Sequence, residues 1–296
     1  MNIKRNSILL LTLFSLFSCK EEMEIDIEEG DRMIGIYGSI TDEEIKHQVI
    51  ISKSADFYKP GNPDMVQNAE VFVLDNWSDT IKYQEIAPGV YETIDTVKGE
   101  VGHTYTLSVI FNDNGETKQY YAQETLLQPP GNIDTIVVCP LSFNGHEIDN
   151  IYKVCPYFQS LKGDDIHYLS KVALDGRIVT DSLSEYSVYN FEGLSGMYIN
   201  GKEMEELYDG NVFPEWVCIL DTSKSDEKLF HDQLLTLYIY RISEEYANFV
   251  QDVQNSSGND PMFGSPANVR SNIKPEGKVL GYFYTASIVK GDVRLK

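Results

Sequence analysis

Neighbouring carboxylates are the residues in this sequence whose spacing could support catalysis. Asp164-Asp165, Glu205-Glu206 and Glu244-Glu245 each place two acidic side chains next to each other. Two carboxyl groups about 5 to 10 Å apart are sufficient for glycoside hydrolysis. However, a chain with 46 Asp and Glu residues forms such pairs by chance. A hydrolase that uses an acidic pair is therefore an alternative, and our expectation is a protein without catalysis.

Other catalytic and cofactor motifs are absent from the sequence. Gly193-Leu194-Ser195-Gly196 lacks the Gly-x-Ser-x-Gly spacing of a nucleophile elbow. No phosphate-binding loop, dinucleotide fingerprint or zinc motif occurs. The five histidines are scattered along the chain, at His47, His103, His146, His167 and His231. We therefore expect no metal and no cofactor.

Two cysteines lie in equivalent surroundings. Cys139 and Cys155 are each found in a Val-Cys-Pro tripeptide, in predicted strands on either side of the turn signal Asn144-Gly145. In an oxidising compartment they could form a disulfide bond across the strands. Two isolated buried thiols are an equally good interpretation.

Aromatic residues are concentrated between residues 186 and 216, where strand periodicity is poor. Exposed rings on a long loop could bind a glycan or a peptide, because flat rings give contact area at a low entropic cost. The alternative is that these rings form the core of a second domain. The candidate aromatics, beside Tyr186, are Tyr189, Phe191, Tyr198, Tyr208, Phe213 and Trp216.

The N-terminal segment has the pattern of a bacterial export signal. Lys4 and Arg5 precede an apolar run, Ile8 to Phe17, which is too short to cross a bilayer core of roughly 30 Å as a helix. Leu16-Phe17-Ser18-Cys19 resembles the lipobox of bacterial lipoproteins. We therefore expect residues 1–18 to be removed and Cys19 to carry the acyl chains of a lipid anchor.

An acidic segment follows the lipidated cysteine. Lys20, Glu21 and Glu22 resemble the signal that sends lipoproteins of Bacteroidota to the outer face of the outer membrane. The alternative is that residues 19–32 only form an acidic, solvated tether, and the two interpretations are compatible. Loss of the two positive charges in residues 1–18 changes the formal charge from −22 to about −24. This charge repels nucleic acid and anionic lipid head groups, so neither is expected as a partner.

Short strands broken by turn residues dominate residues 33–127. Their spacing predicts an antiparallel sandwich similar to an immunoglobulin domain. Asn112-Asp113-Asn114-Gly115 is a typical hairpin turn. The predicted strands are Met33 to Ile40, Gln48 to Ser52, Ala69 to Asp75, Val90 to Thr93, Thr104 to Phe111 and Gln119 to Glu124.

A second β-rich domain is predicted for residues 133–296, after a proline-containing linker at residues 128–132. Within it, Ser243 followed by two acidic residues and an apolar stripe predicts an amphipathic helix near residues 243–255. The fold class is thus mostly β. The predicted strands of this domain are Thr135 to Cys139, Tyr152 to Gln159, Lys171 to Leu174, Val217 to Leu220, Gln233 to Arg241 and Val279 to Val289.

Several segments together resemble one family of Bacteroidota lipoproteins, the domain of unknown function 4249. The resemblance covers nearly the whole chain after the lipobox and implies a β-rich lipoprotein that accompanies a TonB-dependent outer-membrane transporter. It supplies no catalytic residues. The matching segments are Gly38 to Glu43, Ile50 to Ser54, Ala69 to Val71, Pro88 to Tyr91, Gly102 to Leu107, Ile242 to Tyr246, Asn259 to Phe263, Pro266 to Val269, Ser271 to Ile273 and Gly281 to Phe283.

Our expectation from the sequence is a surface-exposed, non-catalytic accessory or ligand-binding lipoprotein of the outer membrane. The two alternatives are the acidic-pair hydrolase and an adhesin or structural surface protein, because fold class alone does not choose among them. A pocket with clustered carboxylates of raised pKa would favour the hydrolase.

Overall fold

The structure is a computed structural model, and it describes residues 33–54, 63–77, 80–143, 145–161, 166–179, 182–183, 186–190, 198–199, 218–221, 232–257, 269–276 and 279–295. The signal segment 1–18 and the tether 19–32 lie outside these ranges. Predictions for Cys19, Lys20, Glu21 and Glu22 therefore stay predictions. Within the described ranges, no helix has the length and apolar character needed to cross a membrane.

The described part of the chain is mostly β-structure, which confirms the predicted fold class at this level. Its helix is α3 (Glu244–Ser257). The strands are β1 (Ile34–Thr41), β2 (Gln48–Lys53), β3 (Asp64–Met65), β4 (Glu70–Asp75), β5 (Thr80–Ala87), β6 (Val90–Thr93), β7 (Thr104–Asp113), β8 (Glu116–Thr125), β9 (Ile133–Phe143), β10 (His146–Gln159), β11 (His167–Leu174), β12 (Arg177–Ile178), β13 (Ser187–Asn190), β14 (Tyr198–Ile199), β15 (Cys218–Asp221), β16 (Leu234–Ile242) and β17 (Val279–Arg294).

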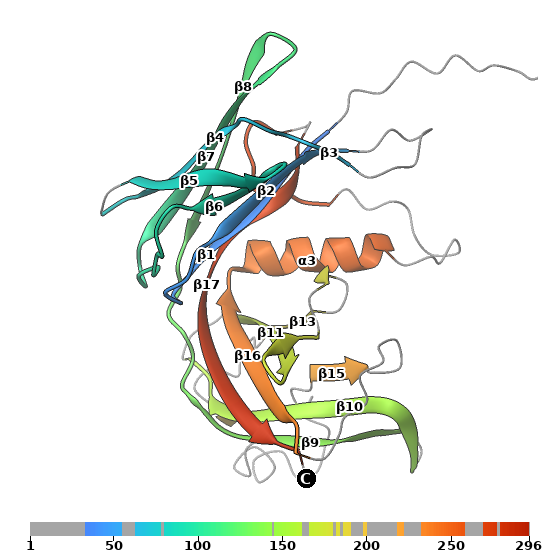
Figure 1. The fold of residues 1–296 in the computed structure, drawn as a ribbon. Helices are drawn as coiled ribbons and strands as arrows, with labels where there is room; N and C mark the ends of the chain where they lie inside the picture. Colours follow the sequence, from blue (N-terminus) through green and yellow to red (C-terminus); the bar gives the residue numbers. More distant parts are fainter. Residues whose placement is uncertain are drawn as a thin grey trace, which may run out of the picture. The chain divides into compact units, whose positions relative to one another are not determined.

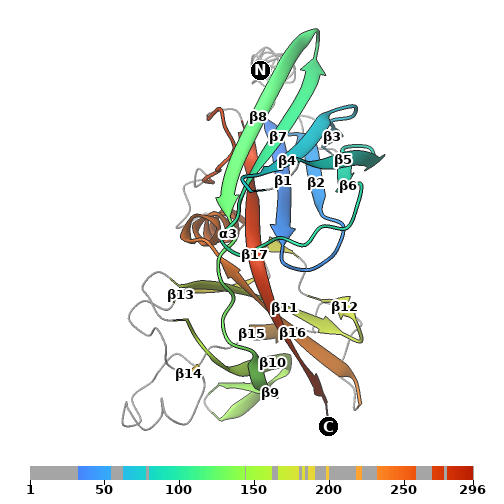
Figure 2. The ribbon, with the colours of Figure 1, turned by 90° about the vertical axis from the view of Figure 1, so that its left-hand side faces the viewer.

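The long strand β17 connects the two groups of strands (Figures 1 and 2). Its first half pairs in parallel with β1, from Val279 to Ala286, and its second half pairs antiparallel with β16, from Ser287 to Arg294. The resulting sheet has the order β12-β11-β16-β17-β1-β2-β6-β5-β4-β7-β8. A smaller sheet has the order β14-β10-β15, with β9 beside β10. The domain boundaries stay predictions, and the structure adds that the C-terminal strand completes the sheet of the N-terminal strands.

Alternating burial explains the core of β1 to β8. Along β1, Ile34, Ile36, Gly38 and Ile40 are buried and the residues that alternate with them are less so, which is the period of a strand with one face on the core. Ile273 and Phe283, from the C-terminal end of the chain, are members of the same core. The N-terminal strands therefore complete their core only when the end of the chain is present.

Helix α3 begins where the sequence predicts it. The backbone N–H of Tyr246 donates to Ser243 Oγ at 3.2 Å, so Ser243 is the N-cap. The apolar stripe, with Tyr246, Phe249 and Val250, is buried against β11, β16 and β17. The ring of Tyr246 stacks on that of Tyr284 at 4.1 Å between centroids. Aromatic packing thus fixes the N-terminal end of α3 against the sheet.

Candidate functional site

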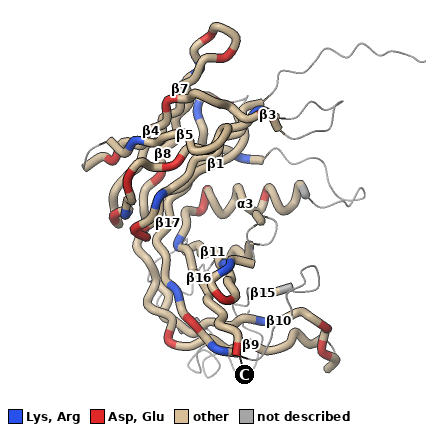
Figure 3. Tube along the Cα trace, in the orientation of Figure 1, with Lys and Arg blue, Asp and Glu red and all other residues tan. Residues whose placement is uncertain are grey.

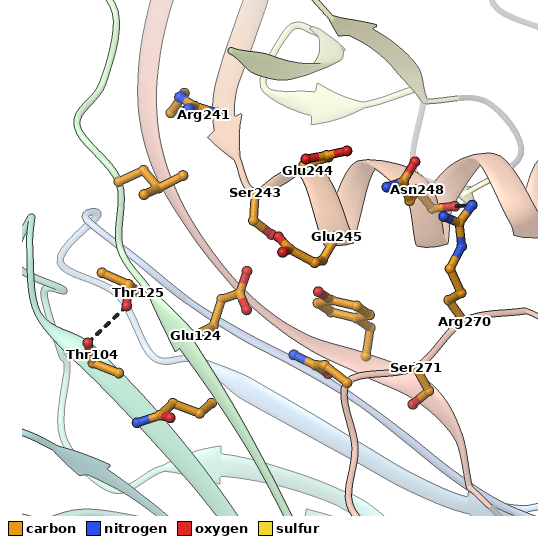
Figure 4. Close-up of a pocket in the computed structure, with 14 residues that line it drawn as sticks. Thr104, Glu124, Thr125, Arg241, Ser243, Glu244, Glu245, Asn248, Arg270 and Ser271 are labelled. Atoms are coloured by element: carbon orange, nitrogen blue, oxygen red, sulfur yellow. Dashed lines mark hydrogen bonds between the residues drawn. The ribbon is translucent and has the colours of Figure 1, made fainter. Parts of the chain in front are cut away.

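A cavity of about 880 Å³ lies between the end of β8 and the N-terminal turn of α3 (Figure 4). Most of the residues that line it have polar or charged side chains. The lining residues are Thr104, Gln123, Glu124, Thr125, Leu127, Arg241, Ser243, Glu244, Glu245, Asn248, Arg270, Ser271, Asn272 and Tyr282. We call it the Glu124 cavity.

Strand alternation turns Glu124 toward the inside of the protein. Along β8, Tyr120 and Ala122 are buried, and Glu124 follows with the same period of two. Its side chain therefore lies on the same face of β8 as these two buried residues, beyond the end of the hydrophobic core. In Figure 4, the side chains of Glu124, Ser243 and Glu245 point toward one another.

Burial raises the pKa of the Glu124 carboxyl group to about 7. Hydrogen bonds with Ser243 and Asn272 favour the ionised form, and the negative charge of Glu245 disfavours it. Because burial outweighs the hydrogen bonds, Glu124 exchanges its proton near neutral pH. A carboxyl group with this property can accept or donate a proton, or accept hydrogen bonds from a ligand.

The segment at residues 270–274 closes one side of the cavity. Asn272 donates to the carbonyl oxygen of Phe283 at 2.7 Å, and its own amide oxygen accepts from the Phe283 N–H at 3.0 Å. Ser271 donates to the Gly281 carbonyl oxygen at 2.7 Å. Lys274 exchanges two backbone hydrogen bonds with Tyr121 of β8, at 2.7 and 3.0 Å. The segment is therefore held to β17 on one side and to β8 on the other.

The two arginines of the lining are engaged in other bonds. The Arg270 guanidinium group donates to both carboxylate oxygens of Asp252, at 2.6 and 2.8 Å. This interaction lowers the pKa of Asp252. Arg241 donates to the carbonyl oxygens of His167 and Ile242, and burial lowers the pKa of its guanidinium group. The lining thus contains three carboxylates, those of Glu124, Glu244 and Glu245, beside two guanidinium groups.

Tyr282 forms part of the lining from β17. Its side chain is 2% exposed, and burial raises its pKa, with a further contribution from the charge of Glu124. The phenol group therefore stays protonated and is a hydrogen-bond donor beside the carboxylates.

The geometry supports two kinds of chemistry. Carboxylate oxygens are acceptors, so the cavity suits a ligand rich in hydroxyl or ammonium donors. In addition, Glu124 with a pKa of about 7 next to Glu245 has the character of an acid and base pair. Among the described residues, no group of three or more His, Cys, Asp or Glu side chains is arranged to hold a metal ion.

One acidic pair predicted from the sequence lies in the cavity. Glu244 and Glu245 form the first turn of α3, where the helix dipole stabilises negative charge, and they also line the cavity. The pairs at residues 164–165 and 205–206 lie outside the described residues. Figure 3 shows acidic positions spread over many elements, with the start of α3 among them.

Among the aromatic residues predicted to bind a ligand or partner, Tyr189 is the one whose side chain the structure describes. This residue lies in β13 and packs, partly buried, against the core that contains Tyr168 and Leu237. Its neighbour Tyr186 is also buried, in the core under α3. Both rings therefore contribute to packing. The remaining candidates Phe191, Tyr208, Phe213 and Trp216 lie outside the described residues, and for Tyr198 only the backbone, in β14, is described.

Of the two interpretations of Cys139 and Cys155, the structure contains the one without a disulfide bond. The register of β9 and β10 places Cys139 opposite Lys153 and Cys155 opposite Val137. The two cysteines are thus diagonal neighbours, whose Cβ atoms are roughly 7 Å apart, whereas a disulfide needs about 4 Å. A cross-strand disulfide requires directly opposed residues.

Sequence reasoning missed Glu124. The available signal was a charged residue at an inward position of a predicted strand, two residues after Ala122. Such a position is costly for a charge unless partners compensate it. Those partners, Ser243 and Asn272, are distant in the sequence.

Comparison with known proteins supplies the family. No curated protein matches the chain. The sequence model of the family described as "Domain of unknown function (DUF4249)" matches residues 20–292. The match includes every strand from β1 to β16, helix α3 and nearly all of β17. The chain therefore belongs to the DUF4249 family.

Proposed function

We propose that the protein is a surface lipoprotein of the outer membrane that binds a polar ligand in the Glu124 cavity, as a non-catalytic accessory subunit of a TonB-dependent transporter. The observation that carries the binding role is the cavity itself, a space of about 880 Å³ lined by three carboxylates and by hydroxyl and amide groups. This size is within the range of small-molecule sites.

Two features of the sequence support the location. Leu16-Phe17-Ser18-Cys19 supports lipidation of Cys19, and Lys20-Glu21-Glu22 supports display on the outer face, as in Bacteroidota lipoproteins. The transporter partnership rests on the family resemblance.

The ligand is a glycan or a peptide, because both carry donors that match the lining. Sugar hydroxyl groups and peptide ammonium groups donate hydrogen bonds, and Glu124, Glu244 and Glu245 accept them. Arg270 offsets this preference little, because Asp252 neutralises its charge, and the three carboxylates of the lining outnumber the Arg241 guanidinium group.

We further propose that strands β1 to β8 form an immunoglobulin-like sandwich, with the Glu124 cavity at one end of it. The support is β5, which pairs with β4 through Thr80 to Lys82 and with β6 through Tyr83 to Ala87. A strand that changes partner along its length can pass from one layer of a sandwich to the other.

A second candidate function, an envelope hydrolase, is favoured by one observation. Glu124 has a pKa of about 7 beside Glu245, as required of a general acid near neutral pH. In this alternative Glu124 donates the proton to the leaving group and Glu245 is the second carboxylate.

The proposed function is tested by purifying the tagged, lipidated protein from its native outer membrane in mild detergent, followed by mass spectrometry of co-purifying proteins. We expect a TonB-dependent transporter in near-equal amount. Cys19→Ala is the matched control, because it removes the anchor and leaves the folded part unchanged. A lipoprotein recovered alone would overturn the accessory role.

The same preparation distinguishes binding from hydrolysis. Oligosaccharides and peptides incubated with the wild type should be recovered intact. If they are cleaved, and if Glu124→Gln abolishes cleavage while binding persists, the hydrolase replaces the accessory subunit as the function.

A further inference from the structure

Trp77 is the most exposed large apolar side chain of the described residues, with 76% of its surface accessible to solvent. It lies two residues after the end of β4, in the turn that follows this strand. An exposed indole is costly in water and is a frequent mark of a binding surface. The surroundings of Trp77 must therefore be considered for a second site, apart from the Glu124 cavity.

The Trp77 ring is held in place by a stack of rings. It stacks on the imidazole ring of His103, with centroids 5.7 Å apart and planes at 21°. His103 in turn stacks on Tyr105, at 6.4 Å and 28°. Tyr105 is 1% exposed and belongs to the core. The exposed ring is thus the outermost member of a stack that begins in the hydrophobic core.

Carboxylates lock the middle ring of this stack. His103 Nδ1 lies 3.0 and 2.9 Å from the two carboxylate oxygens of Asp75, and Nε2 lies 3.3 Å from Glu100. Asp75 also accepts from the Trp77 backbone N–H at 3.0 Å. Because imidazole and backbone are both fixed by Asp75, the indole is supported on one face and is pre-organised.

An exposed carboxylate lies at the edge of His103, the ring that supports the indole. The side chain of Glu100 is 71% exposed and stands at the far side of His103 from Asp75. We propose that Trp77 is a stacking platform for a pyranose ring of a neutral glycan. The C–H groups of a sugar ring carry partial positive charge, which matches the negative face of the indole.

Other occupants fit this geometry less well. A compact organic cation is usually enclosed by several rings, whereas Trp77 offers a single open face. A protein partner needs an apolar core in an interface of about 800 Å² on each surface. The neighbours of the indole are instead polar, namely the imidazole of His103 and the exposed carboxylate of Glu100. Acidic glycans are repelled by the same carboxylate. A neutral sugar ring is the ligand class that remains.

One residue of the Trp77 site, His103, is next in the sequence to a residue that lines the Glu124 cavity. Thr104, the residue after His103, lines the cavity and its hydroxyl group pairs with that of Thr125 at 2.9 Å. The two sites are nevertheless distinct in their residues. Each can therefore be removed without changing the other.

Affinity electrophoresis tests the platform. The full-length protein in mild detergent is run on native gels that contain amylopectin, xylan, galactomannan or the acidic polymer polygalacturonate. We expect retardation by at least one neutral polysaccharide and none by polygalacturonate. Trp77→Ala should weaken this binding about tenfold or more, because the stacking ring is lost. His103→Ala should weaken it less, because the indole remains but loses the ring that supports it. Trp77→Phe keeps a smaller ring and should have an intermediate effect.

Two controls assign the result to Trp77. Tyr121→Ala removes another exposed ring, on β8, and should leave retardation unchanged. Urea unfolding checks that each variant is folded. The proposal is overturned if no neutral polysaccharide retards the wild type, or if Trp77→Ala is retarded equally. Loss of binding in Glu124→Gln alone would assign the glycan to the cavity, and loss of a co-purifying transporter in Trp77→Ala would assign the indole to a protein interface.

Discussion

The hydroxyl groups of Tyr37 and Tyr246 share a hydrogen bond of 2.7 Å, which joins the first strand of the sheet to the helix near the end of the chain. Tyr246 is 1% exposed, and the rings of Tyr282 and Tyr284 pack against it. Each of the two hydroxyl groups therefore has the other as a partner in a largely aromatic surrounding, and that of Tyr37 also interacts with Tyr284. A change to either one leaves its partner without this bond.

Tyr246→Phe and Tyr37→Phe are each expected to lower the free energy of unfolding by about 1 to 2 kcal/mol, because a buried hydroxyl group is left without its partner. The double variant should lose hardly more than either single one. Urea unfolding of the four proteins measures this coupling. Additive losses would mean that the two hydroxyl groups do not depend on each other.

Gly281→Ala is expected to be strongly destabilising, by about 3 kcal/mol or more. Gly281 has a φ of 98°, and a Cβ atom there would clash with the backbone of Ile36 in the paired strand β1. Gly115→Ala is the matched control, since Gly115 has a similar φ of 88° but no atom within 4 Å of the added Cβ. It should cost only the conformational strain, about 1 kcal/mol. Equal losses of unfolding free energy would rule out the clash as the cause.

Local patterns in the sequence are sufficient to predict much of this fold. The strand Val90 to Thr93 was predicted with its observed bounds, because Pro88-Gly89 marks the turn before it. The Asn114-Gly115 turn, with φ values of 53° and 88°, forms the predicted hairpin between β7 and β8. Ser243 caps α3 as its side chain and the following acidic residues indicate. These features depend on residues that are close in the sequence.

Features that depend on distant residues were not predictable in this way. β5 was missed because only Tyr83 among its residues is buried, so the strand shows no alternation of apolar side chains. The parallel pairing of β1 with β17 joins opposite ends of the chain. In the site, Glu245 is predictable from the sequence as part of the first turn of a helix. Glu124 is not, because its partners Ser243 and Asn272 come close to it only in the folded protein.

Ser243 has two roles that two variants can separate. Ser243→Ala removes the N-cap and is expected to lower stability by about 1 kcal/mol. It also removes a hydrogen bond that favours ionised Glu124, so the pKa of Glu124 should rise further. Ser243→Asp keeps a cap and adds negative charge beside Glu124. It should therefore restore stability below pH 7 while it raises the pKa of Glu124 even more.

Carbon-13 NMR of the side-chain carboxyl groups measures these pKa values directly. Glu116, an exposed residue at the other end of β8, is the internal reference. An unchanged Glu124 titration in both variants would show that Ser243 does not contact the carboxyl group in solution.

Stability should decrease with pH because of Glu124. Its pKa of about 7 in the folded state exceeds the ordinary value of about 4.3, so the folded protein holds this proton more tightly than the unfolded chain. The contribution is fully present below about pH 4 and is lost as pH rises to about 7. Because Glu124 is only partly buried, the expected loss is about 1 to 3 kcal/mol.

Glu124→Gln tests this effect, because glutamine keeps the shape of the side chain and cannot ionise. In urea unfolding, the variant should exceed the stability of the wild type by more at pH 8 than at pH 5. Asp42, whose pKa burial also raises, adds a pH dependence of the same sign that both proteins share. The difference between the two proteins therefore isolates Glu124. A difference that is constant from pH 5 to pH 8 would mean that Glu124 has an ordinary pKa, and the acid role in the hydrolase alternative would lose its physical basis.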